Sequence, residues 1–339
     1  MTRCLLFGSI SSSMGESLEL LRERPIHILV NSRAGGGRSL KALPHIKTLL
    51  QQQGVAAQFH TPASALELEN TARQAISGGA TVLLAIGGDG TLQSLVNAAA
   101  GADGTLQSLV NAAPGADVTL GILPTGGGND FAAALNLPKD PIAAAGAILA
   151  GTARRVDLAR ARTADGRERL YCGGGGTGLD AVAVRYAAEV YGSMRGRSRY
   201  LLSALRALRD YSALTIRAEF PGSPIEPVER RVLVAAVLNS PSYGAGLTLA
   251  PAARIDDGLL DVVLVEELTR MEVAGVVFHW AVRGELRTSR IARWKAPQVR
   301  LESDQPCQFQ GDGEILGPLP VDIQVLPKAL QILAPGRSE

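Results

Sequence analysis

The 339-residue chain has few cysteines, few lysines and few aromatic residues. Its three cysteines, Cys4, Cys172 and Cys307, are too few and too scattered for a disulfide framework or a zinc site, and its four histidines do not cluster. Only five of the 34 basic residues are lysines, and the formal net charge of +2 gives no argument for nucleic acid. We therefore expect a protein of the reducing cytoplasm with no nucleic-acid partner.

Long apolar runs are also missing. No segment approaches the roughly 20 residues that a membrane-spanning helix requires. The apolar patch at residues 4–7 is too short for a signal peptide and is followed by no small-x-small cleavage site. Hydrophobic residues still make up 46% of the chain, so its length allows two domains with a sizeable core.

Glycine, by contrast, is abundant, with 38 residues, and much of it follows predicted strands. At residues 84–91 an apolar run ends in Gly87, Gly88, Asp89, Gly90 and Thr91. Glycines let the backbone aim its N–H groups at a phosphate, Thr91 can cap the helix that follows, and Asp89 can reach a magnesium ion or an attacking hydroxyl. Such turns also occur without catalysis, so this motif alone does not establish phosphate binding.

Two further strand-then-glycine units strengthen the interpretation. Residues 26–30 lead into Asn31 and the glycine run at residues 35–37. Residues 118–122 lead into a second loop, which contains Gly126, Gly127, Gly128, Asn129 and Asp130. Ligands bind open α/β sheets outside the carboxyl ends of the strands, so facing glycine loops predict a nucleotide held between them.

With these motifs the chain resembles the diacylglycerol kinase catalytic-domain family, soluble bacterial lipid kinases related to sphingosine kinases and more distantly to NAD kinases. Residues 250–261, Ala-Pro-Ala-Ala-Arg-Ile-Asp-Asp-Gly-Leu-Leu-Asp, and residues 311–314, Gly-Asp-Gly-Glu, extend the resemblance over most of residues 26–328. It implies transfer of the ATP γ-phosphoryl group to a hydroxyl of diacylglycerol or a similar lipid. The active site would lie between an N-terminal α/β nucleotide domain and a C-terminal β-sandwich.

The resemblance also implies site residues. Glu314 is the candidate general base, and Asp89 would organise magnesium–ATP, although related lipid kinases give this aspartate the base role and the sequence does not separate the two. ATP would be bound by Asn31, Gly87, Gly88, Asp89, Gly90, Thr91, Gly126, Gly127, Gly128 and Asn129. Without the resemblance, Asp312-Gly313 would be an ordinary hairpin turn and Glu314 unremarkable.

A structural magnesium ion is implied as well. By resemblance it would bind the Asp257 side chain and the carbonyls of Leu260 and Val262, two strand positions whose carbonyls point the same way. Oxygen-only ligation suits this ion. The alternative to a magnesium site is that Asp257-Gly258 is only a tight turn that leads into a strand.

Three departures from the family pattern concern the glycine loops. Gly127 stands where the family has threonine, which removes one hydroxyl contact to the nucleotide, and four consecutive glycines at residues 173–176 leave the backbone unusually free. In addition, residues 89–99 recur at residues 103–113, a tandem repeat with a period of 14 that makes residues 89–116 a duplication or a sequence error. We assign the active-site role to Asp89 rather than Asp103, because only the first copy follows a strand and both glycines.

Periodicity predicts an α/β plus all-β fold: an N-terminal Rossmann-like parallel sheet with helices, then a C-terminal β-sandwich. We expect residues 1–24 to be a poorly ordered extension, residues 25–154 the nucleotide-binding domain and residues 155–330 the lipid-binding sandwich. The predicted N-terminal strands are 26–30, 56–60, 81–86 and 118–123, alternating with helices 39–53, 65–78, 92–99 and 141–151. Later strands are 155–160, 167–173, 213–219, 230–239, 258–265, 298–303 and 321–325.

An arginine-rich amphipathic stretch at residues 180–211 either lies on an anionic membrane or caps the sandwich with solvated arginines. Expected partners are ATP, a lipid substrate and a transient membrane surface, with a homodimer left open; the protein would be cytoplasmic and peripheral at the membrane when acting. Two other functions also stay open. One is an NAD kinase-like small-molecule kinase, and the other is a non-catalytic nucleotide-binding regulator.

Overall fold

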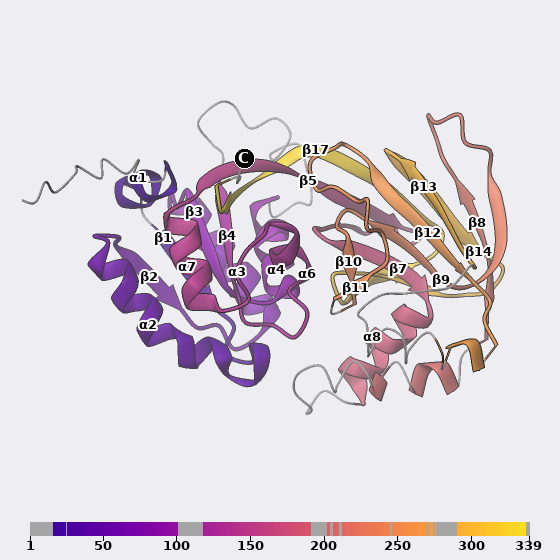
Figure 1. Cartoon of the computed structure of the whole chain (residues 1–339), viewed down its shortest axis with the longest axis horizontal. Coiled ribbons are helices and arrows are strands. Elements are labelled where there is room, and N and C mark those ends of the chain that lie inside the picture. The colour runs from indigo at the N-terminus through magenta and orange to yellow at the C-terminus, as the bar shows by residue number, and fades with distance from the viewer. Residues whose placement is uncertain are drawn as a thin grey trace, which may run out of the picture.

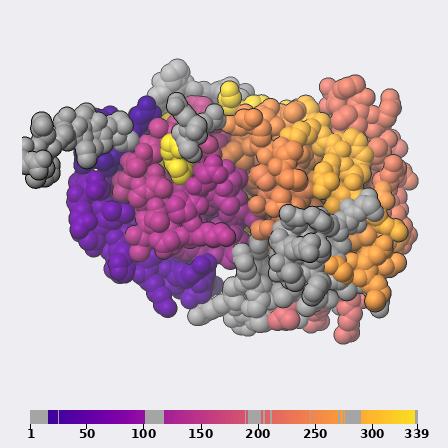
Figure 2. All heavy atoms as spheres, viewed as in Figure 1, coloured from indigo at the N-terminus to yellow at the C-terminus, as the bar shows by residue number. Residues whose placement is uncertain are grey.

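The computed structural model describes residues 16–24, 26–100, 118–190, 202–203, 206–209, 212–244, 246–269, 271–273, 275 and 290–336. Its N-terminal half is an α/β layer structure and its C-terminal half is a β-sandwich (Figure 1). The two halves are in direct contact along a broad boundary (Figure 2). The predicted fold class is therefore confirmed.

Four parallel strands form the N-terminal sheet in the order β2-β1-β3-β4. Their bounds are β1 Ile26–Val30, β2 Ala57–His60, β3 Val82–Gly87 and β4 Thr119–Pro124. Every residue of β3 and β4 is buried, as expected for central parallel strands covered on both faces. The surrounding helices are η1 Ala34–Gly36, α2 Arg38–Gln52, α3 Ala65–Ser77, α4 Asp89–Ala99, α6 Asp130–Ala134 and α7 Pro141–Leu149.

The expectation of a poorly ordered extension over residues 1–24 is wrong for its last part. Helix α1 spans Glu16–Glu23 and buries Leu18 and Leu21, which are three residues apart and so lie on one helix face. The backbone N–H of Ser17 donates to the carbonyl of Gly151 at 3.1 Å. The helix therefore belongs to the N-terminal core, while residues 1–15 lie outside the described part of the chain.

The C-terminal half is built from antiparallel strands in two packed layers, with two core clusters of their own. The strands are β5 Thr152–Thr163, β6 Glu168–Tyr171, β7 Gly174–Gly178, β8 Leu214–Glu219, β9 Val228–Leu238, β10 Ser242–Tyr243, β11 Leu247–Thr248, β12 Leu260–Glu266, β13 Ile291–Ala296, β14 Gln298–Ser303, β15 Gln308–Gly311, β16 Glu314–Pro318 and β17 Val321–Ala334. Helix α8, Leu179–Glu189, follows β7.

Most of the glycine run at residues 173–176 belongs to strand β7. The sequence had suggested an unusually free backbone there. Strand β7 is buried at every position and lies between β9 and β15. A Cβ atom on Gly175 would lie 2.5 Å from Cζ of Phe309, so a side chain there would overlap the aromatic ring. Glycine is normally depleted in strands, and for that reason composition alone did not reveal β7.

Two long antiparallel strands, β5 and β17, connect the halves side by side (Figure 1). The end of β17 pairs in parallel with β4, with Gln331 opposite Thr119, and its Leu330, Ile332 and Leu333 are part of the N-terminal core. The boundaries expected at residues 154 and 330 therefore fall inside continuous strands. In Figure 2 a few yellow atoms of the C-terminal segment emerge among the magenta N-terminal residues.

Parts of two predicted features lie outside the described residues. The second copy of the repeat, residues 103–113, falls within residues 101–117. Of the predicted helical stretch 180–211, α8 accounts for the beginning, residues 202–203 and 206–209 are also helical, and most of the remainder is not described. In the described part of the chain, no helix combines the length and apolar character needed to cross a bilayer.

Candidate active site

The loops after β3 and β4 lie against each other at the carboxyl ends of the parallel strands. The backbone N–H of Thr125 donates to the carbonyl of Gly87 at 2.7 Å, and that of Gly126 reaches the same oxygen at 3.3 Å. A Cβ atom on Gly126 would lie 2.7 Å from the Cα atom of Gly88. Two predicted phosphate loops thus come together, and glycine is needed where they touch.

The third glycine loop, after β1, supports the other two. The Asn31 side chain donates to Oγ1 of Thr91 at 3.0 Å, so Thr91 meets Asn31 within the first turn of α4 instead of capping that helix. The helix begins earlier than predicted, at Asp89. The Arg38 guanidinium donates to the carbonyl of Thr125 at 2.9 Å and also to that of Gly126. The predicted nucleotide residues of all three loops are therefore neighbours.

Asp89 occupies the first turn of α4 and faces the first turn of α6. Its carboxylate accepts hydrogen bonds from the backbone N–H groups of Asp130, at 3.0 Å, and Phe131, at 3.2 Å. Desolvation raises the pKa of Asp89 to about 7, with further contributions from the negative charges of Asp130 and Asp312, while the two backbone N–H groups act in the opposite direction. A cation beside this carboxylate would stabilise its charged form.

The loop after β4 ends at Asn129, whose backbone has the left-handed conformation, with φ 61°. Its side-chain amide donates to the carbonyl of Gly126 at 3.0 Å, which fixes the loop containing Gly127 and Gly128. Its Oδ1 atom is buried and accepts no hydrogen bond from the described residues. This side chain therefore holds the loop from within, at the contact between Gly88 and Gly126.

Glu314 reaches this site from the sandwich, at the start of β16. The preceding turn uses positive φ angles at Asp312, 47°, and Gly313, 87°. A Cβ atom on Gly90 would lie 3.6 Å from Oε1 of Glu314, so the two predicted catalytic segments meet across the boundary between the halves. The pKa of Glu314 is raised, mainly by desolvation; the charge of Arg169 opposes this and that of Asp312 adds to it.

Asp312 is a site residue that the sequence interpretation missed. Its carboxylate accepts three backbone hydrogen bonds, from Cys172 at 2.6 Å, Gly173 at 2.9 Å and Gly174 at 3.1 Å. Desolvation raises its pKa to about 6, against the effect of these three N–H groups. The backbone at the start of β7 thus positions the hairpin that carries Glu314. The sequence contained two signals for this contact, the glycine run and the Asp312-Gly313 turn, but did not show that they meet.

A second unpredicted cluster links α8 to the same hairpin. The Asp180 carboxylate contacts the Tyr243 hydroxyl and accepts a hydrogen bond from Gln310 at 3.1 Å, and Gln310 accepts the backbone N–H of Gly313 at 3.0 Å. A Cβ atom on Gly176 would lie 2.4 Å from the Asp180 carboxylate, so this cluster also depends on the glycine strand. Desolvation raises the pKa of Asp180.

The first copy of the repeat holds the two halves together. Asn97 on α4 exchanges hydrogen bonds with the backbone of Leu170 on β6, at 3.0 and 3.1 Å. Gln93 donates to the carbonyls of Leu170, at 3.3 Å, and Gly311, at 3.2 Å. The helix that begins with Asp89 is therefore docked directly onto the strands next to Glu314.

The residues expected to bind a structural magnesium have a different arrangement. Asp257 lies in the turn before β12, and its Oδ2 atom is 3.1 Å from the Nζ atom of Lys295. Leu260 and Val262 lie in β12, where Val262 pairs with Trp294 of β13 and with Val237 of β9. Within the described ranges, no three His, Cys, Asp or Glu residues are grouped to hold a metal ion.

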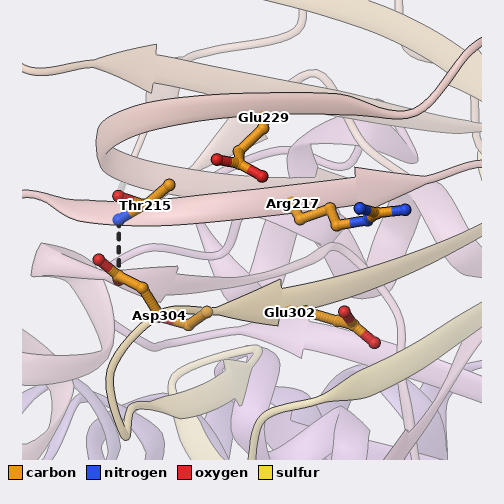
Figure 3. A pocket seen from close by; sticks show the side chains of 6 residues that line it. Thr215, Arg217, Glu229, Glu302 and Asp304 are labelled. Carbon is orange, nitrogen blue, oxygen red and sulfur yellow. Dashed lines mark hydrogen bonds between the residues drawn. The ribbon is translucent and has the colours of Figure 1, made fainter.

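A shallow polar pocket lies elsewhere, on strands β8, β9 and β14 (Figure 3). Thr215, Arg217, Glu229, Glu302, Ser303 and Asp304 line it. Asp304 accepts the backbone N–H of Thr215 at 3.0 Å, and Arg217 pairs with Glu219 at 2.8 Å. None of the predicted site residues lines this pocket.

Comparison with known proteins agrees with this arrangement. Residues 25–161 match the diacylglycerol kinase catalytic domain, and residues 175–334 match the YegS C-terminal NAD kinase beta sandwich-like domain. The chain belongs to the diacylglycerol kinase catalytic-domain family. It is thus a member of a lipid kinase family whose two domain models together cover most of its length.

Individual relatives support the same conclusion. A diacylglycerol kinase of Mycobacterium tuberculosis (strain ATCC 25618 / H37Rv) is 28% identical over 309 residues, covering 91% of this chain and 94% of the relative. One from Bacillus subtilis (strain 168) is 26% identical over 310 residues, covering 91% and 95%. A crystal structure of a diacylglycerol kinase from Bacillus anthracis str. Sterne is similar with a TM-score of 0.66 at 20% identity, covering 92% and 97%, which shows a shared fold.

Proposed function

We propose that this protein is an ATP-dependent kinase that transfers the γ-phosphoryl group to a hydroxyl of diacylglycerol or a similar lipid. The observation that carries the proposal is the meeting of Glu314 with the Asp89 loop, where Oε1 of Glu314 lies against Gly90. Phosphoryl transfer requires positioning and charge stabilisation more than covalent chemistry. Two glycine loops, a carboxylate for the metal and a second carboxylate for the acceptor provide these elements.

The nucleotide phosphates would lie over the glycine loops after β3 and β4. Backbone N–H groups there and the N-terminus of α4 favour negative charge. Asn31 fixes Thr91 beneath them, and Asn129 fixes the loop after β4 through its hydrogen bond to Gly126. ATP enters as its magnesium complex, and Asp89 is the carboxylate placed to meet that ion.

Glu314 would take the proton from the lipid hydroxyl as its oxygen attacks the γ-phosphorus and ADP leaves. Because the pKa of Glu314 is raised, this carboxylate is a stronger base than an ordinary glutamate. Asp312 supports it indirectly, by anchoring the hairpin to the backbone of residues 172–174. Asp89 is the alternative base, and the two roles are separable by mutation.

The acyl chains would contact the sandwich side of the site. Ile315, next to Glu314, is 38% exposed, and Val190, at the end of α8, is 44% exposed. Helix α8 packs against β15 and β16, so these apolar side chains belong to neighbouring elements. We propose transient binding to a membrane surface through this side of the protein, with the acceptor lipid drawn from that membrane.

The test is a kinase assay with purified protein, radiolabelled magnesium–ATP and mixed micelles containing diacylglycerol, with sphingosine, a polyprenol and NAD as parallel acceptors. We expect label in the phosphorylated diacylglycerol. Glu314→Gln should lower kcat by about 10²–10⁴-fold, the usual contribution of a general base, with nearly unchanged ATP affinity. Label in NAD alone would indicate an NAD kinase-like enzyme. ATP binding without turnover on any acceptor would indicate a regulator.

A further inference from the structure

Lys295 is bound by two carboxylates and a carbonyl at the turn where a structural magnesium was expected. Its Nζ atom lies 3.1 Å from Oδ2 of Asp257, 3.2 Å from Oδ2 of Asp261 and 3.0 Å from the carbonyl of Ala252. Asp261 and Lys295 are direct partners across the β12–β13 ladder, and these strands lie beside each other in the sandwich (Figure 1). The contact is therefore fixed by strand register.

The geometry matches the donors of an ammonium group. Lysine carries three N–H donors and no acceptor, and here three oxygens face it. The Asp261 carboxylate is nearly buried, with 7% of its side chain exposed, and needs a positive charge beside it. Arginine is the usual basic residue in this chain, and only five of the 34 basic residues are lysines. Position 295 has a lysine, whose ammonium group is a more compact charge than the guanidinium of arginine.

The expected magnesium ligands do not fit a metal ion in this arrangement. Asp257 has its Oδ1 atom engaged by the backbone N–H of Leu259, at 3.1 Å, and its Oδ2 atom by Lys295. Val262 lies in a strand that is paired on both sides. A divalent cation at Asp257 would lie next to the Lys295 ammonium, where charge repulsion opposes its binding.

The turn is also held without a metal from its other side. The buried carboxylate of Asp157, on β5, accepts the backbone N–H of Gly258 at 2.7 Å and that of Lys328 at 2.7 Å. Arg254 pairs with Asp256 at 3.2 Å. Each of the three neighbouring aspartates, 256, 257 and 261, thus has a cationic partner from the chain itself.

We propose that Lys295 is a built-in cation that takes the place of the structural magnesium ion, so that the turn before β12 folds without a divalent metal. Magnesium would then enter this protein only with the nucleotide. The proposal concerns folding of the sandwich and is independent of which lipid is phosphorylated.

The first test uses the full-length wild-type protein without nucleotide. After dialysis against EDTA, elemental analysis by mass spectrometry should find no stoichiometric magnesium or calcium, and Tm should be the same in EDTA and in millimolar Mg²⁺. One tightly held divalent ion per chain, or a Tm increase in Mg²⁺ that Asp257→Asn abolishes, would overturn the proposal. Because weak Mg²⁺ binding at Asp89 would also change Tm, the comparison is repeated in Asp89→Asn.

The second test removes the internal cation. Lys295→Met should lower Tm in EDTA by about 3 °C, the shift that ~1 kcal/mol produces in a domain of 150–250 residues. Mg²⁺ should restore part of this loss, and the additional change Asp257→Asn should remove the restoration. Lys41→Met, at an exposed position of α2, is the matched control and should change neither value. A Lys295→Met protein as stable as wild type would contradict the proposal; if it does not fold, the metal analysis of the wild type still decides.

Discussion

At the scale of single residues, the candidate site gathers carboxylates from both halves of the chain. The negative charges of Asp130 and Asp312 raise the pKa of Asp89, and that of Asp130 raises the pKa of Asp312, in addition to the larger effect of desolvation at both groups. Backbone N–H groups offset part of this cost at Asp89 and at Asp312. A cluster of desolvated carboxylates of this kind is stabilised by a cation bound beside it.

Asp89→Asn tests the electrostatic cost of this arrangement. The folded-state pKa of Asp89, about 7, lies above the unfolded value near 4, so the folded state binds the extra proton between these limits and stability falls as pH rises through this range. The Asn variant lacks this dependence. Since a folded-state pKa of about 7 lies two units above pH 5, the effect is about 2.7 kcal/mol, and we expect the Tm of the variant relative to wild type to increase by about 5–10 °C between pH 5 and pH 8, measured by calorimetry without nucleotide. A difference that is constant across pH would contradict the raised pKa.

Gly127→Thr addresses the loop that lacks the family's threonine. A hydroxyl at this position should add one hydrogen bond to the nucleotide, worth about 1 kcal/mol, and so tighten ATP binding roughly five-fold with little change in kcat. Equilibrium binding of ATP and single-turnover rates measure the two effects separately. Weaker binding of ATP by the variant would show that the loop requires glycine here for a steric reason.

At the scale of elements, glycine is used for close approach between neighbouring segments. The loops after β1, β3 and β4 touch at backbone atoms, and β7 fits between two strands because it has almost no side chains. This explains why the glycine-rich strand β7, which looks flexible in sequence, is buried. The same segments fix both the nucleotide loops and the hairpin of Glu314.

Gly35→Ala and Gly37→Ala form a matched pair within one loop. Both positions have positive φ, 56° and 92°, so both variants carry a similar backbone cost of roughly 1 kcal/mol. Only at Gly35 would the new methyl group collide, 1.8 Å from the carbonyl of Thr125; at Gly37 it meets no atom within 4 Å. We expect ATP affinity to fall about ten-fold in Gly35→Ala, a change of ~1.4 kcal/mol, and to be retained in Gly37→Ala. Equal affinities would show that the contact with Thr125 does not position the loop.

At the scale of the whole molecule, strands β5 and β17 couple the two halves. The end of β17 contributes side chains to the N-terminal core, and helix α4 is hydrogen-bonded to β6. The candidate site, which combines groups from both halves, depends on this coupling.

Leu333→Ala tests the coupling. Leu333 is fully buried in the N-terminal core, so the truncation should cost about 2–5 kcal/mol. We expect one cooperative transition at lower temperature, seen alike by far-ultraviolet circular dichroism and by fluorescence of Trp280 and Trp294, which are the chain's two tryptophans. Leu66→Ala, at a side chain 68% exposed, is the control. Two separate transitions would mean that the halves fold independently.

Deletion of residues 103–116 tests whether the duplicated segment is needed. The first copy supplies Asp89, Gln93 and Asn97, which make the described contacts of the site and of the boundary between the halves. We therefore expect a soluble deletion variant with unchanged or higher Tm and with wild-type kinase activity. An insoluble product would show that the second copy has become part of the core. Asp103→Asn, which should have little effect, complements this experiment.

The sequence by itself determined the alternation of strands and helices in the N-terminal half, the two-part architecture and the position of the glycine loops. These are local signals: apolar runs form buried strands, and glycine followed by a carboxylate marks a turn that approaches a ligand. Short-range patterns of this kind survive in any context, and for that reason Asn31 and Asp89 were identifiable as candidates, whereas Glu314 was identified only through the family resemblance.

Only the tertiary structure decided which of these residues meet. Strand β7 was invisible because its glycines have no propensity for strands, and its place is set by Phe309 and Leu238 on the neighbouring strands. Asp312 gained its role from the backbone of residues 172–174, about 140 positions earlier in the chain. Lys295 reached Asp257 and Asp261 through the register of β12 and β13. Contacts over such separations depend on strand order and register, which no local pattern encodes.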